Sequence, residues 1–174
     1  HWERYAAVGV GFGWEEQDLD RVVYDDYRNY MIAFRELRQL GYKRIGTVLS
    51  NQFVQGHRGG NKWYPGYLDC QSTTPESERI PLFSGSTPMP GCAFTQEMEA
   101  KLPGEFLEWF TAWRPEALIT LVGNEKRWLD AMGLNIPQDI GLVCLAQTAN
   151  AAFAGIDEKG ELIGSTAVEL VAAK

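Results

Sequence analysis

The segment spanning residues 27–49 constrains the fold of this chain more than any other part of the sequence. Its apolar side chains recur with the spacing of one face of an amphipathic helix. They are Tyr27, Tyr30, Met31, Phe34 and Leu37. Gly41 follows this run, at the position where a left-handed residue commonly ends a helix. The apolar residues 45–49 come next, so the segment predicts a helix, a tight turn and a central parallel strand covered on both faces.

The rest of the chain alternates apolar runs with amphipathic ones, which favours an α/β fold. Strands are predicted at residues 5–12, 21–24, 80–83, 117–122, 140–145 and 154–156. Helices are predicted at residues 57–70, 96–102, 103–113, 125–132 and 161–173. The last of these helices is expected to turn five side chains inward: Leu162, Ile163, Ala167, Val168 and Val171. Ligands of open parallel sheets bind beyond the carboxyl ends of the strands, so a site is expected at that edge.

The composition excludes several kinds of function. A net charge of −7 over 174 residues lacks the basic footprint of a nucleic-acid-binding surface. No apolar run approaches the roughly 20 residues of a membrane span, and no secretory signal pattern stands at the amino end. The three cysteines show no CxxC spacing, which indicates unpaired thiols in a reducing compartment. His1 and His57 are the only histidines, so a histidine-based metal cluster is not expected.

The sequence contains no motif for catalysis or cofactor binding. The patterns GxxxxGK[ST], GxSxG and HExxH are missing, and no GxGxxG follows a predicted strand. Two pairs of carboxylates, Glu15 with Glu16 and Asp25 with Asp26, are adjacent, and adjacency carries no acid–base signal. The chain is therefore expected not to be an enzyme and to use no cofactor or metal.

Polar residues stand where the predicted strands end. They are Asn51, Gln52, Asn124 and Gln147. Because parallel strands present their carboxyl ends at one edge, these side chains are expected to contact a ligand together. Arg58 lies near the amino end of the helix predicted at residues 57–70 and is expected across the pocket from them. The alternative for Arg58 is an ordinary solvated position on the surface.

Asp25 and Asp26 precede the helix of the central segment and allow two interpretations. One of them can cap that helix and complement its dipole. Alternatively, one of them faces a ligand at the carboxyl end of the strand predicted at residues 21–24. We take Asp25 as a candidate ligand-binding residue and leave the capping alternative open.

Four segments carry a resemblance to a known family. They are AFRELRQLGYKRIGTVL, RPEALITLVGNEK, GLNIPQDIGLVCL and GIDEKGELIGSTAVELV. Each resembles a motif of the LacI/GalR family of transcriptional regulators, and the four occur in that family's order over nearly the whole chain. The turn IPQDIG, which follows the loop after the second segment, is the most specific of them.

This resemblance implies a periplasmic-binding-protein-like fold of type I, in which two Rossmann-like lobes with parallel sheets close over a small effector. In the family a helix-turn-helix headpiece lies at the amino terminus. This chain is expected to lack the headpiece and the first part of the amino-terminal lobe. On this mapping residues 1–43 and 158–174 belong to an incomplete amino-terminal lobe, and residues 44–157 form the carboxyl-terminal lobe.

The chain departs from the family's pattern at the expected pocket. Gln147 stands near the place where the family usually has an acidic pair, and Asn124 follows Gly123 at the family's "nd" position. The aspartate that usually opens the first helix maps to Tyr24 or Asp25, depending on the offset. Arg58 lies near the family's effector-binding arginine. The effector therefore cannot be copied from better-known members.

The resemblance implies the effector-binding domain of a cytoplasmic transcriptional regulator. A sugar or related small molecule is the expected effector, and its binding would alter lobe closure and affinity for operator DNA. The family also implies a homodimer that contacts DNA through its headpiece, with no membrane partner. The aromatic residues of WFTAW, at 109–113, are expected in the core or in a subunit contact.

Two rival functions come from other classes. A periplasmic-type solute-binding protein of a transporter would have the same fold, and a signal peptide in the upstream coding sequence would support it. A sugar-modifying α/β enzyme is the other rival, and the missing catalytic motifs argue against it.

Overall fold

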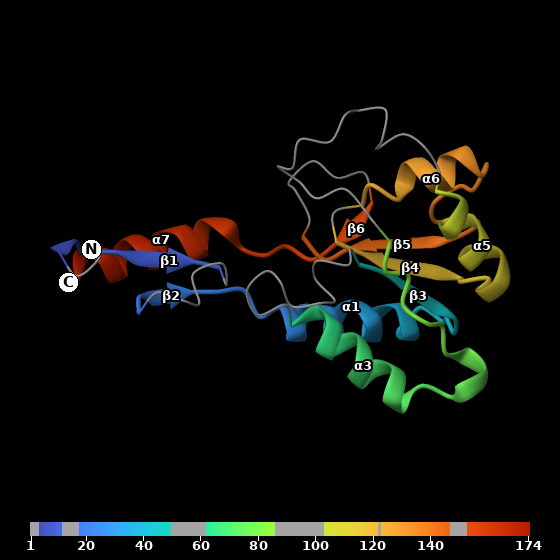
Figure 1. The fold of residues 1–174 in the computed structure, drawn as a ribbon, viewed down its shortest axis with the longest axis horizontal. Helices are drawn as coiled ribbons and strands as arrows, with labels where there is room; N and C mark the ends of the chain where they lie inside the picture. Colours follow the sequence, from blue (N-terminus) through green and yellow to red (C-terminus); the bar gives the residue numbers. More distant parts are fainter. Residues whose placement is uncertain (1–3, 12–17, 50–61, 86–102, 122, 147–152) are drawn as a thin grey trace.

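The computed structural model describes residues 4–11, 18–49, 62–85, 103–121, 123–146 and 153–174. The chain forms two lobes of unequal size (Figure 1). The larger lobe is a parallel sheet between helices, and the smaller lobe has two short strands beside one helix. Two segments join the lobes: residues 23–25, the first crossing, and residues 156–159, the second crossing. The predicted α/β architecture with parallel sheets is confirmed.

The sheet of the larger lobe has its strands in the order β3, β4, β5, β6, all parallel. Their bounds are Ile45–Val48, Ala117–Thr120, Gly141–Cys144 and Ala154–Gly155. On the other side of β3, Phe83 forms a parallel bridge with Val48. The chain thus passes from β3 to Phe83 on one side and then to β4 on the other. Such a reversal of strand order is a topological switch point, where α/β sheets bind ligands.

One face of this sheet is covered by α1 (Asp26–Gln39) and α3 (Trp63–Thr73). The short 3-10 helix η2 (Glu76–Glu78) follows α3. Tyr30 is fully buried in this layer, and its hydroxyl lies 2.7 Å from the Thr47 hydroxyl of β3. The core includes Phe34, Leu37, Ile45, Leu49 and Tyr67. The helix and strand predicted from the central segment are therefore confirmed, with their apolar faces packed together.

Tyr27 departs from that prediction. Its side chain is 39% exposed, and its hydroxyl donates to Asp69 Oδ2 at 2.6 Å. The phenol thus links α1 to α3 at the surface, where the first turn of α1 lies at the margin of the core. The helical period correctly places Tyr27 on the α3 side, but its burial was predicted wrongly.

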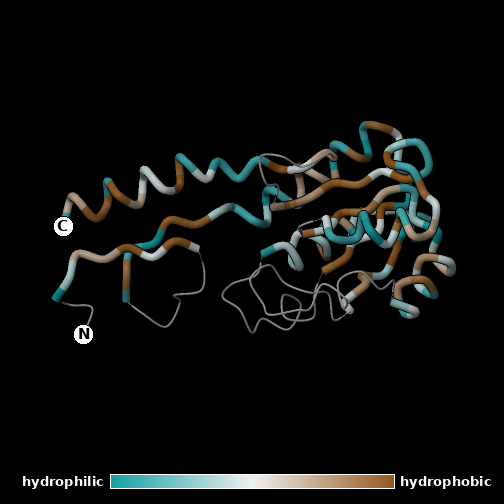
Figure 2. The backbone as a smooth tube through the Cα atoms, turned by 90° about the horizontal axis from the view of Figure 1, so that it is seen from above, coloured by the Kyte–Doolittle hydropathy of each residue, from teal (hydrophilic) through white to brown (hydrophobic). Residues whose placement is uncertain are grey.

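The opposite face is covered by α5 (Gly104–Trp113) and α6 (Lys126–Ala131). Phe106 of α5 is fully buried there, and Trp128 and Leu129 of α6 pack in the same core. Side chains on this face of the strands, such as Leu118 of β4 and Leu142 of β5, belong to the same core. Figure 2 shows that the strands of this lobe are largely hydrophobic, as expected for a sheet covered on both faces.

The smaller lobe consists, within the described residues, of β1 (Val8–Val10), β2 (Asp20–Val22) and α7 (Gly160–Ala172). The two strands are parallel, and α7 packs against them. Only Ala167 of the five side chains expected inward is buried; Leu162 is 63% and Val168 68% exposed. The inward orientation was therefore wrong for Leu162 and Val168. Figure 2 shows α7, which ends at the C label, alternating between hydrophobic and hydrophilic residues.

The lobe boundary predicted after residue 43 does not follow the packing. α1 packs against α3 and the larger sheet, through Tyr30, Ala33, Phe34 and Leu37. Between β2 and α1, the chain passes from the smaller lobe to the larger lobe at the first crossing, before Asp26. Gly41 and the turn after it connect two elements of the same lobe, so they do not mark a domain boundary.

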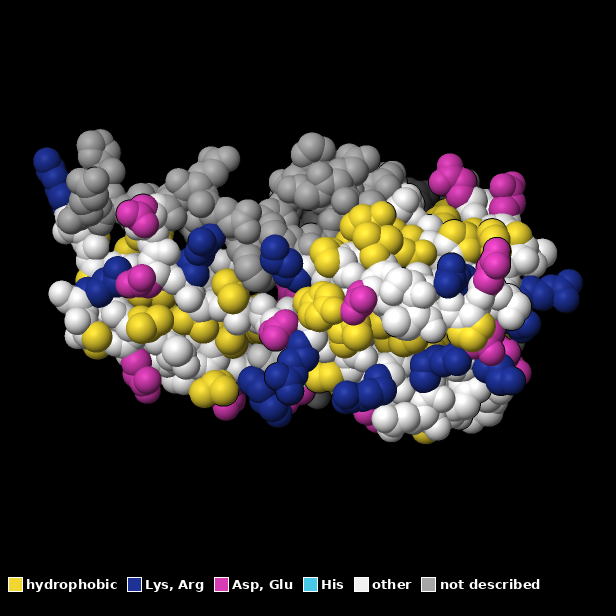
Figure 3. All heavy atoms as spheres, turned by 90° about the horizontal axis from the view of Figure 1, so that it is seen from below, with side chains coloured by type: hydrophobic (Ala, Val, Ile, Leu, Met, Phe, Trp, Pro, Cys, Tyr) yellow, Lys and Arg dark blue, Asp and Glu magenta, His cyan; other side chains and the backbone are white. Residues whose placement is uncertain are grey.

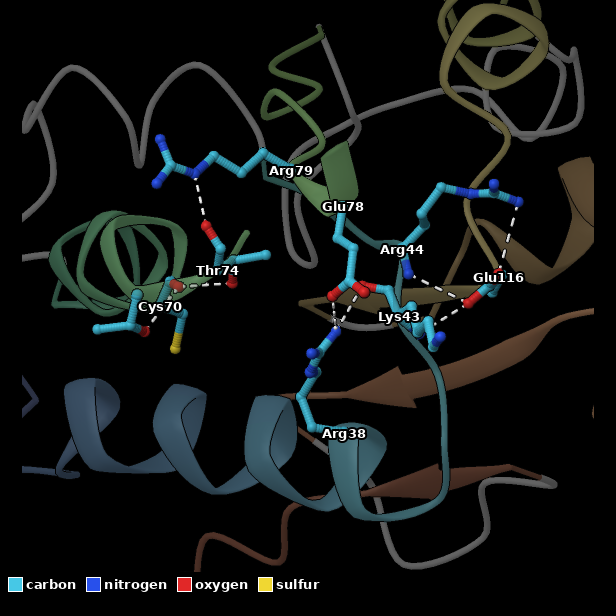
Figure 4. A network of polar contacts seen from close by, with 9 residues as sticks. Arg38, Lys43, Arg44, Cys70, Thr74, Glu78, Arg79 and Glu116 are labelled. Atoms are coloured by element: carbon cyan, nitrogen blue, oxygen red, sulfur yellow. Dashed lines mark hydrogen bonds and ion pairs between the residues drawn. The ribbon is translucent and has the colours of Figure 1, made fainter. Parts of the chain in front are cut away.

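A polar network closes the amino-terminal edge of the larger sheet (Figure 4). Glu116 Oε2 accepts hydrogen bonds from the backbone N–H groups of Lys43 at 2.7 Å and Arg44 at 3.1 Å. Arg38 Nη1 donates to Glu78 Oε2 at 2.6 Å, which ties the end of α1 to η2. These contacts satisfy groups that the ends of helices and strands leave free.

Gly46 of β3 allows the closest approach between the sheet and α5. A Cβ at this position would meet Trp109 Cη2 at 2.6 Å and Leu118 Cδ2 at 3.0 Å. We expect Gly46→Ala to lower the free energy of unfolding by about 1–3 kcal/mol, the usual cost of overpacking. Chemical denaturation measures this, and Gly104→Ala, whose Cβ would meet nothing within 4 Å, is the control. Equal stability of the two variants would contradict the close packing of Trp109 on β3.

Candidate functional site

The carboxyl edge of the larger sheet lies next to the two crossings, where the lobes meet (Figure 1). The described residues at this edge come from the ends of β4 and β5, the start of α1 and the second crossing. Because the sheet has its switch point beside β3, this edge is the expected ligand site for the fold. We therefore take it as the candidate ligand site.

Most residues predicted to bind the ligand lie outside the described residues. They are Asn51, Gln52, Arg58 and Gln147. The structure describes the other two, Asp25 and Asn124. Asn124 is half-buried in the turn between β4 and α6, at the carboxyl edge.

Asp25 is exposed and caps α1. Its Oδ1 accepts a hydrogen bond from the backbone N–H of Arg28 at 3.0 Å. This is the capping alternative that the sequence left open. Its ligand-binding role stays a prediction, since capping occupies one carboxylate oxygen and leaves the other available.

Asp26, the next residue, is in a different environment. Only 4% of it is exposed, and its Oδ1 has no hydrogen-bond partner among the described residues. Burial, and after it the negative charges of Glu158 and Asp25, raise the pKa of the Asp26 carboxyl to about 7. Asp26 is thus a desolvated carboxyl at the end of the first crossing.

Glu158 approaches Asp26 from the second crossing. Burial raises the pKa of Glu158, which is half-buried. The pKa of the Tyr24 hydroxyl is also raised, by burial and then by the charges of Glu158 and Asp26. Tyr24 lies in the first crossing and Asp26 directly follows it. The charge of Glu158, in the second crossing, acts on both of them.

Glu125 forms another buried carboxyl at the carboxyl end of β4. It is 4% exposed, and its Oε2 has no hydrogen-bond partner among the described residues. Burial raises its pKa to about 7, although its own backbone N–H and the Thr120 hydroxyl act in the opposite direction. Gly123 keeps the preceding turn tight: its φ is +78°, and a Cβ there would overlap the Phe153 ring.

Cys144, at the end of β5, is another buried group at this edge. Burial raises the pKa of its thiol to about 11, and the charges of Glu125 and Glu158 contribute. The thiol is therefore protonated at neutral pH and unsuited to nucleophilic attack. Its Sγ donates to the Leu121 carbonyl at 2.9 Å. The edge as a whole combines buried carboxyls with neutral donors, an arrangement that can bind a ligand rich in hydrogen-bond donors.

Sequence reasoning did not name Glu125 or Glu158 as candidates, and of the pair Asp25 and Asp26 it chose Asp25. Glu125 directly follows the predicted Asn124, so placing the strand end one residue later would have found it. Asp26 and Asp25 are chemically identical neighbours, and only the direction of the first helical turn separates them. Glu158 lies between Asp157 and Lys159 in a short charged run, which carries no signal of burial.

The amino-terminal edge of the sheet has an open depression of about 1000 Å³. It lies before β3, β4 and β5, and its lining includes Tyr42, Arg44, Pro115, Glu116, Gln138 and Asp139. Both carboxylates in it already have partners: Glu116 pairs with Arg44, and Asp139 accepts from the Asn135 backbone at 2.8 Å. We therefore favour the carboxyl edge, where buried polar atoms have no partner.

Two further features bear on the chemistry of the molecule. In the ranges that the structure covers, no three His, Cys, Asp or Glu side chains form a group that could hold a metal ion. None of the helices described is both long and apolar enough to cross a membrane.

The fold is shared with solved structures of LacI-type regulators and periplasmic-binding-protein-like proteins. No protein-family model and no curated protein matches the sequence. A LacI transcriptional regulator from a Rhodococcus species matches 99% of this chain, with a TM-score of 0.69 at 18% identity. A periplasmic binding protein/LacI transcriptional regulator from Alkaliphilus metalliredigens, complexed with D-xylulofuranose, matches 95% with a TM-score of 0.68 at 15% identity.

A third structure, of a LacI-family regulator from Enterococcus faecium with bound ribose, matches 88% of this chain, with a TM-score of 0.59 at 18% identity. The present chain spans 60% of the Alkaliphilus protein, 65% of the Rhodococcus protein and 56% of the Enterococcus protein. The predicted resemblance is thus confirmed at the level of the fold, which this chain shares with LacI-type regulators and periplasmic-binding-protein-like proteins. The partial coverage agrees with an amino-terminal lobe represented here only in part.

Proposed function

We propose that this chain is the effector-binding part of a LacI-type transcriptional regulator, and not an enzyme. The observation that carries the proposal is a set of buried, unpartnered carboxyl oxygens at the switch-point edge, beside both crossings. A ligand bound there would touch both lobes and so favour one lobe arrangement over another. Differential affinity for two arrangements is what coupling to a distant headpiece requires.

The proposed effector is a sugar or related small molecule. Two of the similar structures hold D-xylulofuranose and ribose, according to their descriptions. The predicted contacts Asn51, Gln52, Asn124 and Gln147, with Arg58 and Asp25, remain part of the proposal. Loss of one hydrogen bond to a neutral ligand group would weaken binding by on the order of 1 kcal/mol.

DNA contact is proposed to come from a separate headpiece in the full-length, cytoplasmic protein. The net charge of −7 supports this, because a DNA-binding surface needs a basic patch. Figure 3 shows basic and acidic side chains interspersed over one face of the molecule, which gives that face no single sign. We also propose a homodimer, since a two-fold protein matches two half-sites on DNA.

The full-length protein should select one DNA sequence from a random library of short duplexes. D-ribose or another sugar from a panel should then change the affinity for that duplex by roughly 5- to 150-fold, the usual range of allosteric coupling. Sedimentation at micromolar concentration should give a dimer. Failure to enrich any sequence, or a monomer with and without the duplex, would contradict the regulator proposal.

A solute-binding protein of a transporter remains the second candidate, because the description of the Alkaliphilus structure names both classes. The buried free thiols of Cys70 and Cys144 favour a reducing compartment instead. A helix-turn-helix encoded upstream would exclude the transporter candidate, and a signal peptide there would support it.

A further inference from the structure

Both crossings run between the two lobes (Figure 1), and each has a carboxyl group within it or directly beside it. Asp26 follows the first crossing directly, and Glu158 lies within the second. The negative charge of Glu158 raises the pKa of the Asp26 carboxyl, and only burial contributes more to that rise. Asp26 is 96% buried, and its Oδ1 accepts no hydrogen bond from the described residues. A buried carboxylate without a donor is unfavourable, so this group calls for a partner.

The described surroundings supply negative charge and no compensating cation. The charges that act on Asp26 are those of Glu158 and Asp25. Lys159, the nearest cation in sequence to Glu158, pairs through Nζ with Asp157 instead. Two like charges held near each other in a desolvated site oppose each other's ionisation. A cation placed between them would relieve both the repulsion and the unsatisfied oxygen.

The kind of cation follows from the remaining groups. Tyr24 lies close enough to both carboxyls for their charges to raise its pKa, and an aromatic ring beside carboxylates suits an organic ammonium. Although Asp25 is a third carboxylate nearby, these side chains form no group that could hold a metal ion among the described residues. A neutral hydroxyl could donate one hydrogen bond but would leave the repulsion between the carboxylates in place.

We propose that Asp26 and Glu158 form a subsite for a protonated amino group of the effector, so that the ligand is a small amine such as an amino sugar. This rests on the proposed function, because it uses the same site between the lobes. The amine would bridge the two crossings and thereby bind one lobe arrangement preferentially. Because binding of the cation favours both ionised carboxyls, it should release protons near pH 7.

Matched pairs of probes test this proposal. Amino sugars and linear amines, including D-glucosamine, D-galactosamine and putrescine, are compared with D-glucose, D-galactose and 1,4-butanediol by thermal shift and calorimetry at pH 7.5. At least one amine should bind while its neutral counterpart does not. Calorimetry in two buffers of different ionisation enthalpy should show proton release. If no amine binds, or if neutral counterparts bind equally well, the proposal is wrong.

Variants separate this subsite from general electrostatics. Asp26→Asn and Glu158→Gln should each weaken amine binding at least tenfold. The control is Asp157→Asn, which removes one negative charge from the exposed residue beside Glu158 and keeps the Oδ1 that accepts from the Lys159 backbone N–H. Its affinity should stay within about twofold of the unmodified protein, and an equal loss in all three variants would overturn the assignment. Circular dichroism confirms folding, and either Asp26→Asn or Glu158→Gln suffices if the other does not fold.

The outcomes also distinguish this proposal from the proposed function. Amine binding without any effect on a selected duplex would support the subsite and contradict the regulator. A neutral sugar that alters duplex affinity, with no amine binding, would support the regulator and refute the subsite.

Discussion

Replacing Phe106 with alanine should lower the free energy of unfolding by roughly 3–5 kcal/mol, the largest effect expected from a single substitution in this chain. Phe106 is fully buried at the centre of the layer that covers one face of the larger sheet. Its ring centroid lies 4.8 Å from that of Trp128, 5.4 Å from Phe83, 5.7 Å from Phe110 and 5.8 Å from Trp109.

The cost combines two terms. Removing the ring loses its transfer free energy from water, and it leaves a cavity that four large rings cannot easily fill. Tilted aromatic pairs at such distances add attraction beyond the buried area. Urea denaturation followed by tryptophan fluorescence measures the change, because Trp109 and Trp128 report directly on this layer.

Leu107 on the same helix is the matched control. It is 42% exposed, so Leu107→Ala also truncates a large apolar side chain, but at a position with much less burial. We expect a change of about 1 kcal/mol or less, since alanine also favours the helix. A loss for Phe106→Ala that is no larger than for Leu107→Ala would show that the aromatic layer is loosely packed.

Phe34 should respond similarly on the other face of the sheet. It is 8% exposed and packs with Tyr30 in the layer formed by α1 and α3. The helical period of the central segment predicted this packing, and Phe34→Ala should also cost roughly 3–5 kcal/mol. A shift well under 1 kcal/mol would mean that the helix contributes little to the core.

The sequence predicted the elements of the larger lobe well because each one has a strong period of its own. β3 and β4 are apolar on both faces, which is typical of a covered parallel strand, and Gly41 correctly marks the end of α1. The spacing of apolar residues does not predict which side chains are buried when a helix or strand has little to pack against. Leu162 and Val168 lie on an amphipathic helix, but within the described residues that helix covers only two short strands.

The candidate site was harder to predict, for a related reason. The local sequence pattern does not show which carboxyl group is buried away from water. Burial of a carboxyl group here depends on how the two crossings pack against the sheet. Asp25 and Asp26 have the same chemistry and adjacent positions, yet one caps α1 in contact with water and the other is buried. The placement rule for parallel sheets did point to the edge where Asp26 and Glu125 are buried, because it depends on topology and not on individual side chains.

The buried carboxyls should also make stability depend on pH in an unusual direction. The pKa of Asp26 and that of Glu125 are each raised to about 7, chiefly by burial. A carboxyl whose pKa is higher in the folded state holds its proton more tightly there, so it favours folding at low pH. That contribution is complete below the ordinary carboxyl pKa and is lost as the pH rises through about 7.

Other carboxyls act in the opposite direction in a lower range of pH. The pKa values of Glu116, Asp139 and Asp157 are lowered, since backbone N–H groups and, for Asp157, the Lys159 ammonium favour their ionised forms. Their contribution is present above the ordinary carboxyl pKa and is lost as the pH falls below it. Stability should therefore be greatest near pH 4–5 and should fall between pH 5 and pH 8.

Asp26→Asn and Glu125→Gln isolate the two buried groups. Each replacement keeps the shape of the side chain and removes the titration, so it should flatten the fall between pH 5 and pH 8. At pH 8 each variant should be more stable than the unmodified protein by a few kcal/mol, at about 1.4 kcal/mol per unit of pKa difference. Unfolding midpoints measured in urea from pH 4 to pH 8 give the comparison, and parallel profiles for all three proteins would show that Asp26 and Glu125 ionise normally in the folded state.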